Sequence, residues 1–170
     1  MAVPRHHVNP PDDIGANELA EIQFKDDLIL ALSLAESAIT DLVSTVLYRK
    51  GKALELGQDL ISKMTASKKI DLLKNTMKEI GKEDSETDNV IRKLKFLSEV
   101  RNRMGHGDKV VDISDDEIEI QKVFGTKPTK RYRKENISEV FGHSLFDIID
   151  DIKYSFSDEL LKIRDENQAF

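Results

Sequence analysis

The stretch that decides the fold is residues 85–107, SETDNVIRKLKFLSEVRNRMGHG. Its apolar side chains recur at the spacing that places them on one face of an α-helix: Val90, Leu94, Leu97 and Met104. Ser85 followed by Asp88 resembles a capping box, which predicts the beginning of this helix. Two glycines flank His106, and because glycine tolerates unusual backbone dihedrals, they predict a bend or an end of the helix there.

Three further helices are predicted before this stretch. The first runs from about Asn17 to Lys50, with its apolar positions at Ile22, Ile29, Leu32, Ile39, Val43 and Val46. The second covers residues 53–64 and should direct one apolar face to the core: Ala53, Leu56, Leu60 and Met64. The third follows Ser67 as its cap, carries Ile70, Leu73, Met77 and Ile80, and ends at Gly81.

After residue 107 the period of the pattern changes. Val111 and Ile113, then Ile118 and Ile120, alternate around a polar turn at residues 114–116, which predicts a β-hairpin at about residues 109–123. A basic loop is expected at about residues 125–134, and a closing helix from Asn136 to about Arg164. The predicted fold is therefore all-α, a bundle of four to five helices with a small hairpin before the last. Its domain covers residues 17–165, between an N-terminal tail (1–16) and a C-terminal tail (166–170).

Composition limits the classes of function. The chain has 170 residues, 39% hydrophobic and 34% charged, which suits one soluble domain with its own core. It has no Cys, which excludes disulfides and thiolate metal sites. No apolar run approaches the ~18 residues of a membrane span, and residues 1–13 lack the apolar region of a secretory signal, so we expect a cytoplasmic protein without membrane contact. The net charge of −6 means that any nucleic acid must meet a local basic patch.

Arg101 stands on the apolar stripe of its helix, four and seven residues after Leu97 and Leu94. An unpaired buried guanidinium is costly, so Arg101 requires an acidic partner or a polar cleft. Glu36 is on the apolar stripe of the first predicted helix, four residues after Leu32, and is the predicted partner. The pair is either a structural salt bridge between the two helices or a device by which Glu36 orients Arg101 for a ligand.

His106 follows Arg101 by five residues, a rotation of roughly 140° in a straight helix. The two side chains would then point to different faces, unless the chain bends at Gly105. The alternative is that His106 only caps the helix end.

The residues Arg101-Asn102-x-x-x-His106, followed by Gly107, resemble the motif of HEPN domains, in which four to six residues separate an Arg from a His. The order of predicted elements, with the motif near the end of a late helix, a hairpin and a closing helix, is also similar to that family over residues 17–165. The resemblance implies a helical bundle, a homodimer that brings two motifs together, and frequently a metal-independent endoribonuclease from toxin–antitoxin or anti-phage systems. Other members are non-catalytic RNA-binding, protein-binding or assembly modules.

The chemistry of such cleavage suits these residue types. The 2′-hydroxyl of RNA is the internal nucleophile, His106 can act as general acid or base, and Arg101 can hold the phosphate. Asn102 would bind the phosphate or fix the His tautomer; the alternative is that it is only a polar residue at the helix end. Glu36 would support Arg101. The expected partners are RNA (tRNA or mRNA), a second copy of the chain, and an antitoxin or defence-system protein. Toxins paired with a nucleotidyltransferase antitoxin carry Tyr two residues after the His, where this chain has Asp108, which argues against that partner.

A basic stretch at residues 127–134 provides candidate RNA contacts, with phosphates on the cations and a base on the aromatic ring: Lys127, Lys130, Arg131, Tyr132, Arg133 and Lys134. The alternative for this stretch is a solvated loop. A third hypothesis makes the chain a regulatory subunit that uses it to contact tRNA or a phosphorylated partner. No metal-ligand or nucleotide-binding motif is present, so the sequence predicts neither a metal nor another cofactor.

Overall fold

The computed structural model describes residues 16–48, 51–105, 109–113, 118–121, 131–133 and 137–168, and it describes the strands by their backbone alone. Its first half consists of α1 (Ala16–Tyr48), α2 (Lys52–Ser62), α3 (Ala66–Glu79) and α4 (Ser85–Gly105). Three strands follow, β1 (Lys109–Ile113), β2 (Ile118–Gln121) and β3 (Arg131–Arg133). The chain continues through α5 (Ile137–Phe141), α6 (Leu145–Asp150), the π-helical turn η1 (Asp151–Phe156) and α7 (Ser157–Gln168). The described fold is thus mostly helical, as the composition and periodicity predict.

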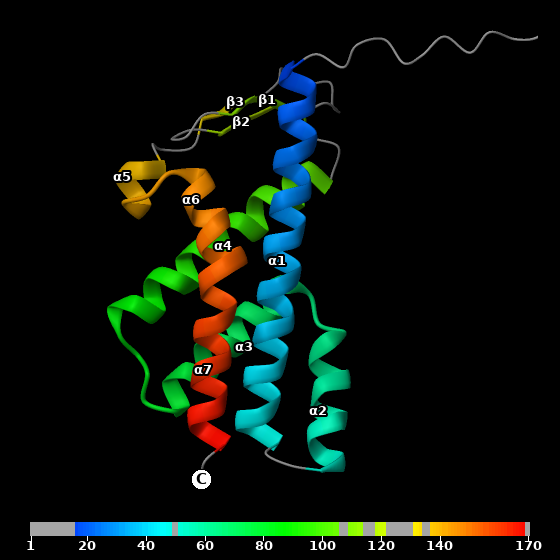
Figure 1. The fold of residues 1–170 in the computed structure, drawn as a ribbon, viewed down its shortest axis with the longest axis vertical. Helices are drawn as coiled ribbons and strands as arrows, with labels where there is room; N and C mark the ends of the chain where they lie inside the picture. Colours follow the sequence, from blue (N-terminus) through cyan, green and yellow to red (C-terminus); the bar gives the residue numbers. More distant parts are fainter. Residues whose placement is uncertain are drawn as a thin grey trace, which may run out of the picture.

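The long helix α1 organises the bundle. It packs against α7, α2, α3, η1 and α4, so that helices from both halves of the chain surround it (Figure 1). Its inward side chains are almost completely buried, among them Leu28, Ile39, Leu42 and Val43. Burial of such side chains is the main favourable term in folding, which explains why α1 is the axis of the structure.

The length and composition of α1 also satisfy the requirement for a membrane span. Within Glu18–Tyr48, an 18-residue window has a mean hydropathy of 1.5, and 56% of that window is buried inside the protein. The expectation that no segment approaches a membrane span is therefore wrong for α1. The burial gives a direct reason for the apolar composition of α1, because the core helix of a soluble protein meets the same criteria of length and hydropathy.

The second helix faces the other way from the prediction. Leu56 and Leu60 of α2 are exposed, while Gly57 and Ile61 are buried against the rest of the fold. The predicted inward face (Ala53, Leu56, Leu60 and Met64) is therefore wrong. Because Gly57 has no side chain, the Tyr48 ring of α1 lies directly over it, and this close approach sets the buried face.

Two predicted helix starts are shifted. Thr65 caps α3 in place of Ser67, and its side chain accepts a hydrogen bond from Lys68 N. Asp84 accepts a hydrogen bond of 2.8 Å from Thr87 N at the beginning of α4, where Ser85 was the expected cap. This hydrogen bond lowers the pKa of the Asp84 carboxyl below its ordinary value of 3.8.

The predicted closing helix is divided. Gly142 has a φ of 70°, in the left-handed region that ends a helix, and its N–H donates to Ser138 O. Ser144 then caps α6 by accepting from Asp147 N. The helical path continues through η1 and α7 to Gln168, past the expected end at Arg164.

The three strands form one antiparallel sheet in the order β1-β2-β3, near the first turns of α1 (Figure 1). The polar turn at residues 114–116 of the predicted hairpin lies outside the described residues. The prediction of a loop at residues 125–134 is wrong for residues 131–133, because their backbone pairs with β2 as a strand.

Candidate functional site around Arg101 and Glu36

Arg101 lies in the last turns of α4, where the core opens to solvent. Leu97 and Leu94, one and two turns earlier on the same stripe, are buried, whereas 42% of the Arg101 side chain is exposed. The stripe therefore continues past the edge of the core, so the Arg101 side chain keeps contact with water.

Glu36 is the ion-pair partner of Arg101 among the described residues. Its Oε1 lies 3.5 Å from Arg101 Nη2, so the pair predicted from the two apolar stripes is present. Glu36 is half-buried in the middle of α1. At this distance the contact is an ion pair and not a short hydrogen bond.

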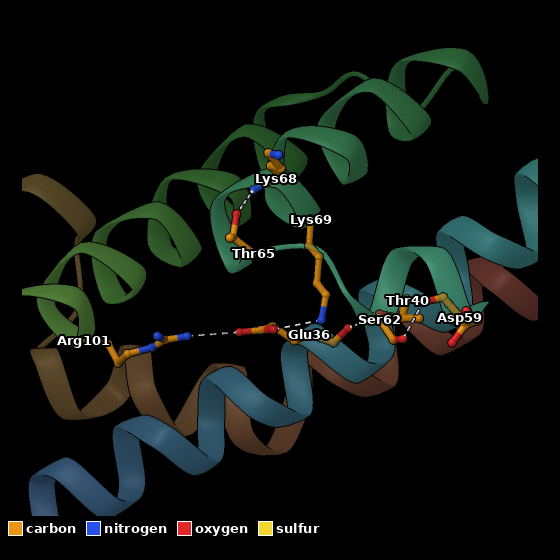
Figure 2. A network of polar contacts seen from close by, with 8 residues as sticks. All are labelled: Glu36, Thr40, Asp59, Ser62, Thr65, Lys68, Lys69 and Arg101. Atoms are coloured by element: carbon orange, nitrogen blue, oxygen red, sulfur yellow. Dashed lines mark hydrogen bonds and ion pairs between the residues drawn. The ribbon is translucent and has the colours of Figure 1, made fainter. Parts of the chain in front are cut away.

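Lys69 is a third member of the site, which the sequence analysis missed. Its Nζ donates a hydrogen bond of 2.9 Å to Oε2 of Glu36, and only 7% of its side chain is exposed. Figure 2 shows Lys69 and Arg101 reaching Glu36 from opposite sides. The signal was present in the sequence, since Lys69 is three residues after Ala66 and four before Leu73, both buried.

The charges of these three side chains do not cancel. One carboxylate faces one ammonium and one guanidinium, which leaves the cluster with a net charge of +1. The protein as a whole is acidic, so this is a local excess of positive charge against the global field. Such a cluster can attract an anion at its exposed end, which is Arg101.

The remaining residues of the motif have different surroundings. Asn102 is exposed, and as the next residue of α4 it points about 100° away from Arg101. Arg103 Nη2 lies 2.7 Å from Glu99 Oε1, one turn earlier in α4. His106 lies outside the described residues, so its approach to Arg101 stays a prediction.

The candidate RNA contacts lie mostly outside the described residues as well. Lys127, Lys130 and Lys134 are not described. The other three, Arg131, Tyr132 and Arg133, form β3, whose backbone pairs with residues 119–121 of β2. Their proposed contacts with RNA are therefore untested predictions.

In the part of the chain that the structure describes, no group of three or more His, Asp or Glu side chains is placed to hold a metal ion. The side chains around Arg101 are instead suited to binding an anion, because their net charge is positive.

Two pockets in the described part of the chain lie away from the three charged residues of the cluster. These adjoining pockets of about 290 and 270 Å³ run between α4, η1, α7 and the end of α3, and share Val90 and Phe156 in their walls. Neither is lined by Glu36, Lys69 or Arg101. Lys93, in the wall of the larger pocket, already forms an ion pair: its Nζ lies 2.8 Å from Oδ2 of Asp151. We place the candidate site at Arg101 because the three-residue charge cluster carries the recognisable chemistry, whereas the pocket's lysine is already paired.

Comparison with known proteins gives no independent assignment. No family model, no curated protein and no solved structure matches the chain significantly.

Proposed function

We propose that this protein is a metal-independent endoribonuclease of the HEPN type, acting in the cytoplasm as a homodimeric toxin or anti-phage defence effector. The observation that carries the proposal is the position of Arg101. It is held at the edge of the core by Glu36, its side chain is 42% exposed, and it begins the sequence RNRMGH. A cation fixed at an accessible site can bind a phosphodiester with little further loss of conformational entropy.

The proposed reaction uses residues of this chain only. Arg101 binds the scissile phosphate and stabilises the charge that develops on it. As the 2′-oxygen bonds to phosphorus, His106 of one copy accepts the 2′-hydroxyl proton. His106 of the second copy, in its protonated form, donates a proton to the 5′-oxygen as the bond from phosphorus to that oxygen breaks, which leaves a 2′,3′-cyclic phosphate and a 5′-hydroxyl. Asn102 supports one of these groups, and the basic stretch at residues 127–134 holds the flanking RNA.

An uncovered apolar surface supports the homodimer. Ile29 and Ile22 precede Glu36 by seven and fourteen residues, so they follow the same side of α1, and their exposed fractions are 54% and 44%. Leu19, Leu30 and Leu34 widen this surface. Exposed apolar patches next to polar residues mark interaction sites. A second copy that covers this surface would bring its own Arg101 close to the first.

A non-catalytic HEPN-like module is the second candidate. The observation that favours it is Lys69, because a buried ammonium bound to Glu36 fits a scaffold that fixes α3 against α1. In that case the Arg101 ion pair stabilises the bundle, and the chain binds RNA or a protein without cleaving it.

One experiment distinguishes the endoribonuclease from the non-catalytic module. Purified protein is incubated with total RNA in EDTA, beside His106→Ala and the control His143→Ala, whose exposed imidazole lies in the turn after α5. The nuclease proposal expects cleavage by the wild type and His143→Ala, and a loss of about 10²–10⁴ in rate for His106→Ala. Equal cleavage by both variants, or no cleavage by the wild type, contradicts it.

A further inference from the structure

Lys69 occupies an unfavourable position for a cation. It lies in the first turn of α3, where the helix dipole is positive, and this turn has no acidic residue. Its side chain is also buried, which removes most of the hydration of the ammonium. A methionine would fill the same space without either cost, so the position of Lys69 requires an explanation.

The contacts of Glu36 explain why a lysine stands at position 69. Lys69 Nζ lies 2.9 Å from one carboxylate oxygen of Glu36 and makes a hydrogen bond. Arg101 Nη2 lies 3.5 Å from the other oxygen. The carboxylate is therefore held more closely by Lys69 than by Arg101, and its negative charge is shared between them (Figure 2).

This sharing changes what Arg101 can bind. An Arg101–Glu36 pair by itself is neutral, and a carboxylate in full contact with the guanidinium competes with any phosphate for the same N–H groups. With Lys69 present the cluster keeps a net charge of +1, and 42% of the Arg101 side chain stays exposed to solvent.

We propose that Lys69 is a positioning residue, which binds Glu36 so that Arg101 stays available for a phosphodiester anion. The inference rests on the proposed function for the identity of that anion. It assigns to Lys69 a role that acts through Glu36 and involves no contact with RNA.

The chain contains a matched control. Lys68 is the preceding residue in the same turn of α3, is exposed, and points away from Glu36 (Figure 2). Lys68→Met removes the same charge from the protein as Lys69→Met, but it leaves Glu36 with its partner. A difference between the two variants therefore reports the contact with Glu36 and not the net charge.

The experiment measures binding of a labelled single-stranded RNA by fluorescence anisotropy in the His106→Ala background, where proposed cleavage cannot interfere. We expect Lys69→Met to raise the Kd about tenfold or more, a change of ~1.4 kcal/mol, and Lys68→Met to raise it less than about twofold. Lys69→Met combined with Glu36→Gln should return the Kd to within about threefold of the starting protein, because the competing carboxylate is gone. Equal effects of the two lysine variants, or no recovery in the double variant, would overturn the inference.

Glu36→Gln alone provides a test that does not depend on the folding of Lys69→Met. The inference expects it to bind RNA at least as tightly as the parent, since Arg101 loses its competitor. With His106 restored, its KM should be unchanged or lower while kcat falls, because Arg101 is less well oriented. Weaker binding by Glu36→Gln contradicts the inference.

Failure of the inference can be separated from failure of the proposed function. Inorganic phosphate is titrated while the guanidinium NMR signal of Arg101 is recorded in the wild type, Lys68→Met and Lys69→Met. A phosphate response that weakens only in Lys69→Met supports the inference even if the wild type does not cleave RNA. If phosphate leaves the Arg101 signal of the wild type unchanged, there is no anion site to maintain, and the inference is wrong.

Discussion

Oε1 of Glu36 lies 3.5 Å from Nη2 of Arg101, so an ion pair joins the middle of α1 to the last turns of α4 at the edge of the core. The other oxygen of Glu36 binds Lys69 of α3. One carboxylate thus connects three helices, through residues that are more than 30 positions apart in the sequence. Its two contacts differ in burial, which leads to different expectations for stability.

Removing Glu36 should cost more stability than removing Arg101. Glu36→Ala leaves the buried ammonium of Lys69 without its hydrogen-bond acceptor, and we expect the free energy of unfolding to fall by about 1–3 kcal/mol. Arg101→Ala breaks a long, half-exposed ion pair and should cost less than about 1 kcal/mol. Urea denaturation measures both, with Lys95→Ala as the control, because its pair with Asp71 is exposed on both sides. An equal cost for Glu36→Ala and Arg101→Ala would mean that Lys69 does not depend on Glu36.

The exposed apolar surface of α1, made of Leu19, Ile22, Ile29, Leu30 and Leu34, should control the oligomeric state. Ile29→Glu places a charge in the middle of this face, and we expect it to convert a dimer into a monomer without loss of helical content. Leu56→Glu on α2 is the control, since Leu56 is equally exposed but belongs to another helix. Sedimentation velocity and circular dichroism provide the two readouts. A dimer that is insensitive to Ile29→Glu but lost in Leu56→Glu would move the interface to α2.

The cap of α4 should make stability depend on pH in the acidic range. The hydrogen bond from Thr87 N lowers the pKa of Asp84 in the folded protein, so the folded state holds this carboxylate in its charged form more strongly than the unfolded state does. The resulting stabilisation is complete above the unfolded value of 3.8 and is lost as the pH falls through the lowered folded pKa. Asp84→Ala should therefore lower the Tm at pH 7 by more than it does in strong acid. Melting curves over that range check this expectation, and a pH-independent difference would contradict it.

The ion pair between Lys93 and Asp151 should respond unequally to its two deletions. Lys93 is buried, whereas 45% of the Asp151 side chain in η1 is exposed. Asp151→Ala leaves a buried ammonium unpaired and should cost about 1–3 kcal/mol of unfolding free energy. Lys93→Met leaves only a hydrated carboxylate and should cost less, which urea denaturation can measure. The reverse order would mean that the methylene groups of Lys93 matter more than its charge.

Several elements were predictable because their signals are local. The periodic apolar positions around Leu94 and Leu97 predict α4, and those around Ile39 and Val43 predict the core face of α1. The Glu36–Arg101 pair was also predictable, because a charged residue on an apolar stripe needs a partner and each stripe offered one.

Other features were not predictable from local patterns. The buried face of α2 was assigned to Leu56 and Leu60, whereas the structure buries Gly57 and Ile61. Both faces carry apolar residues, and the choice between them depends on the Tyr48 ring of α1, which packs over Gly57. Lys69 was missed although it stands on the stripe of Ala66 and Leu73, since a lysine inside a helix usually belongs to the solvated face.

The sequence by itself determined the helical class and the approximate course of its long helices, because periodicity acts within one or two turns. It also indicated Glu36 as the partner of Arg101, because each charge stands on the apolar stripe of its own helix. The tertiary structure alone decided which helix faces are buried and that Lys69 shares the Glu36 carboxylate with Arg101. These depend on contacts between helices distant in sequence, and the free energy of such contacts is set by packing and desolvation, which a local pattern does not contain.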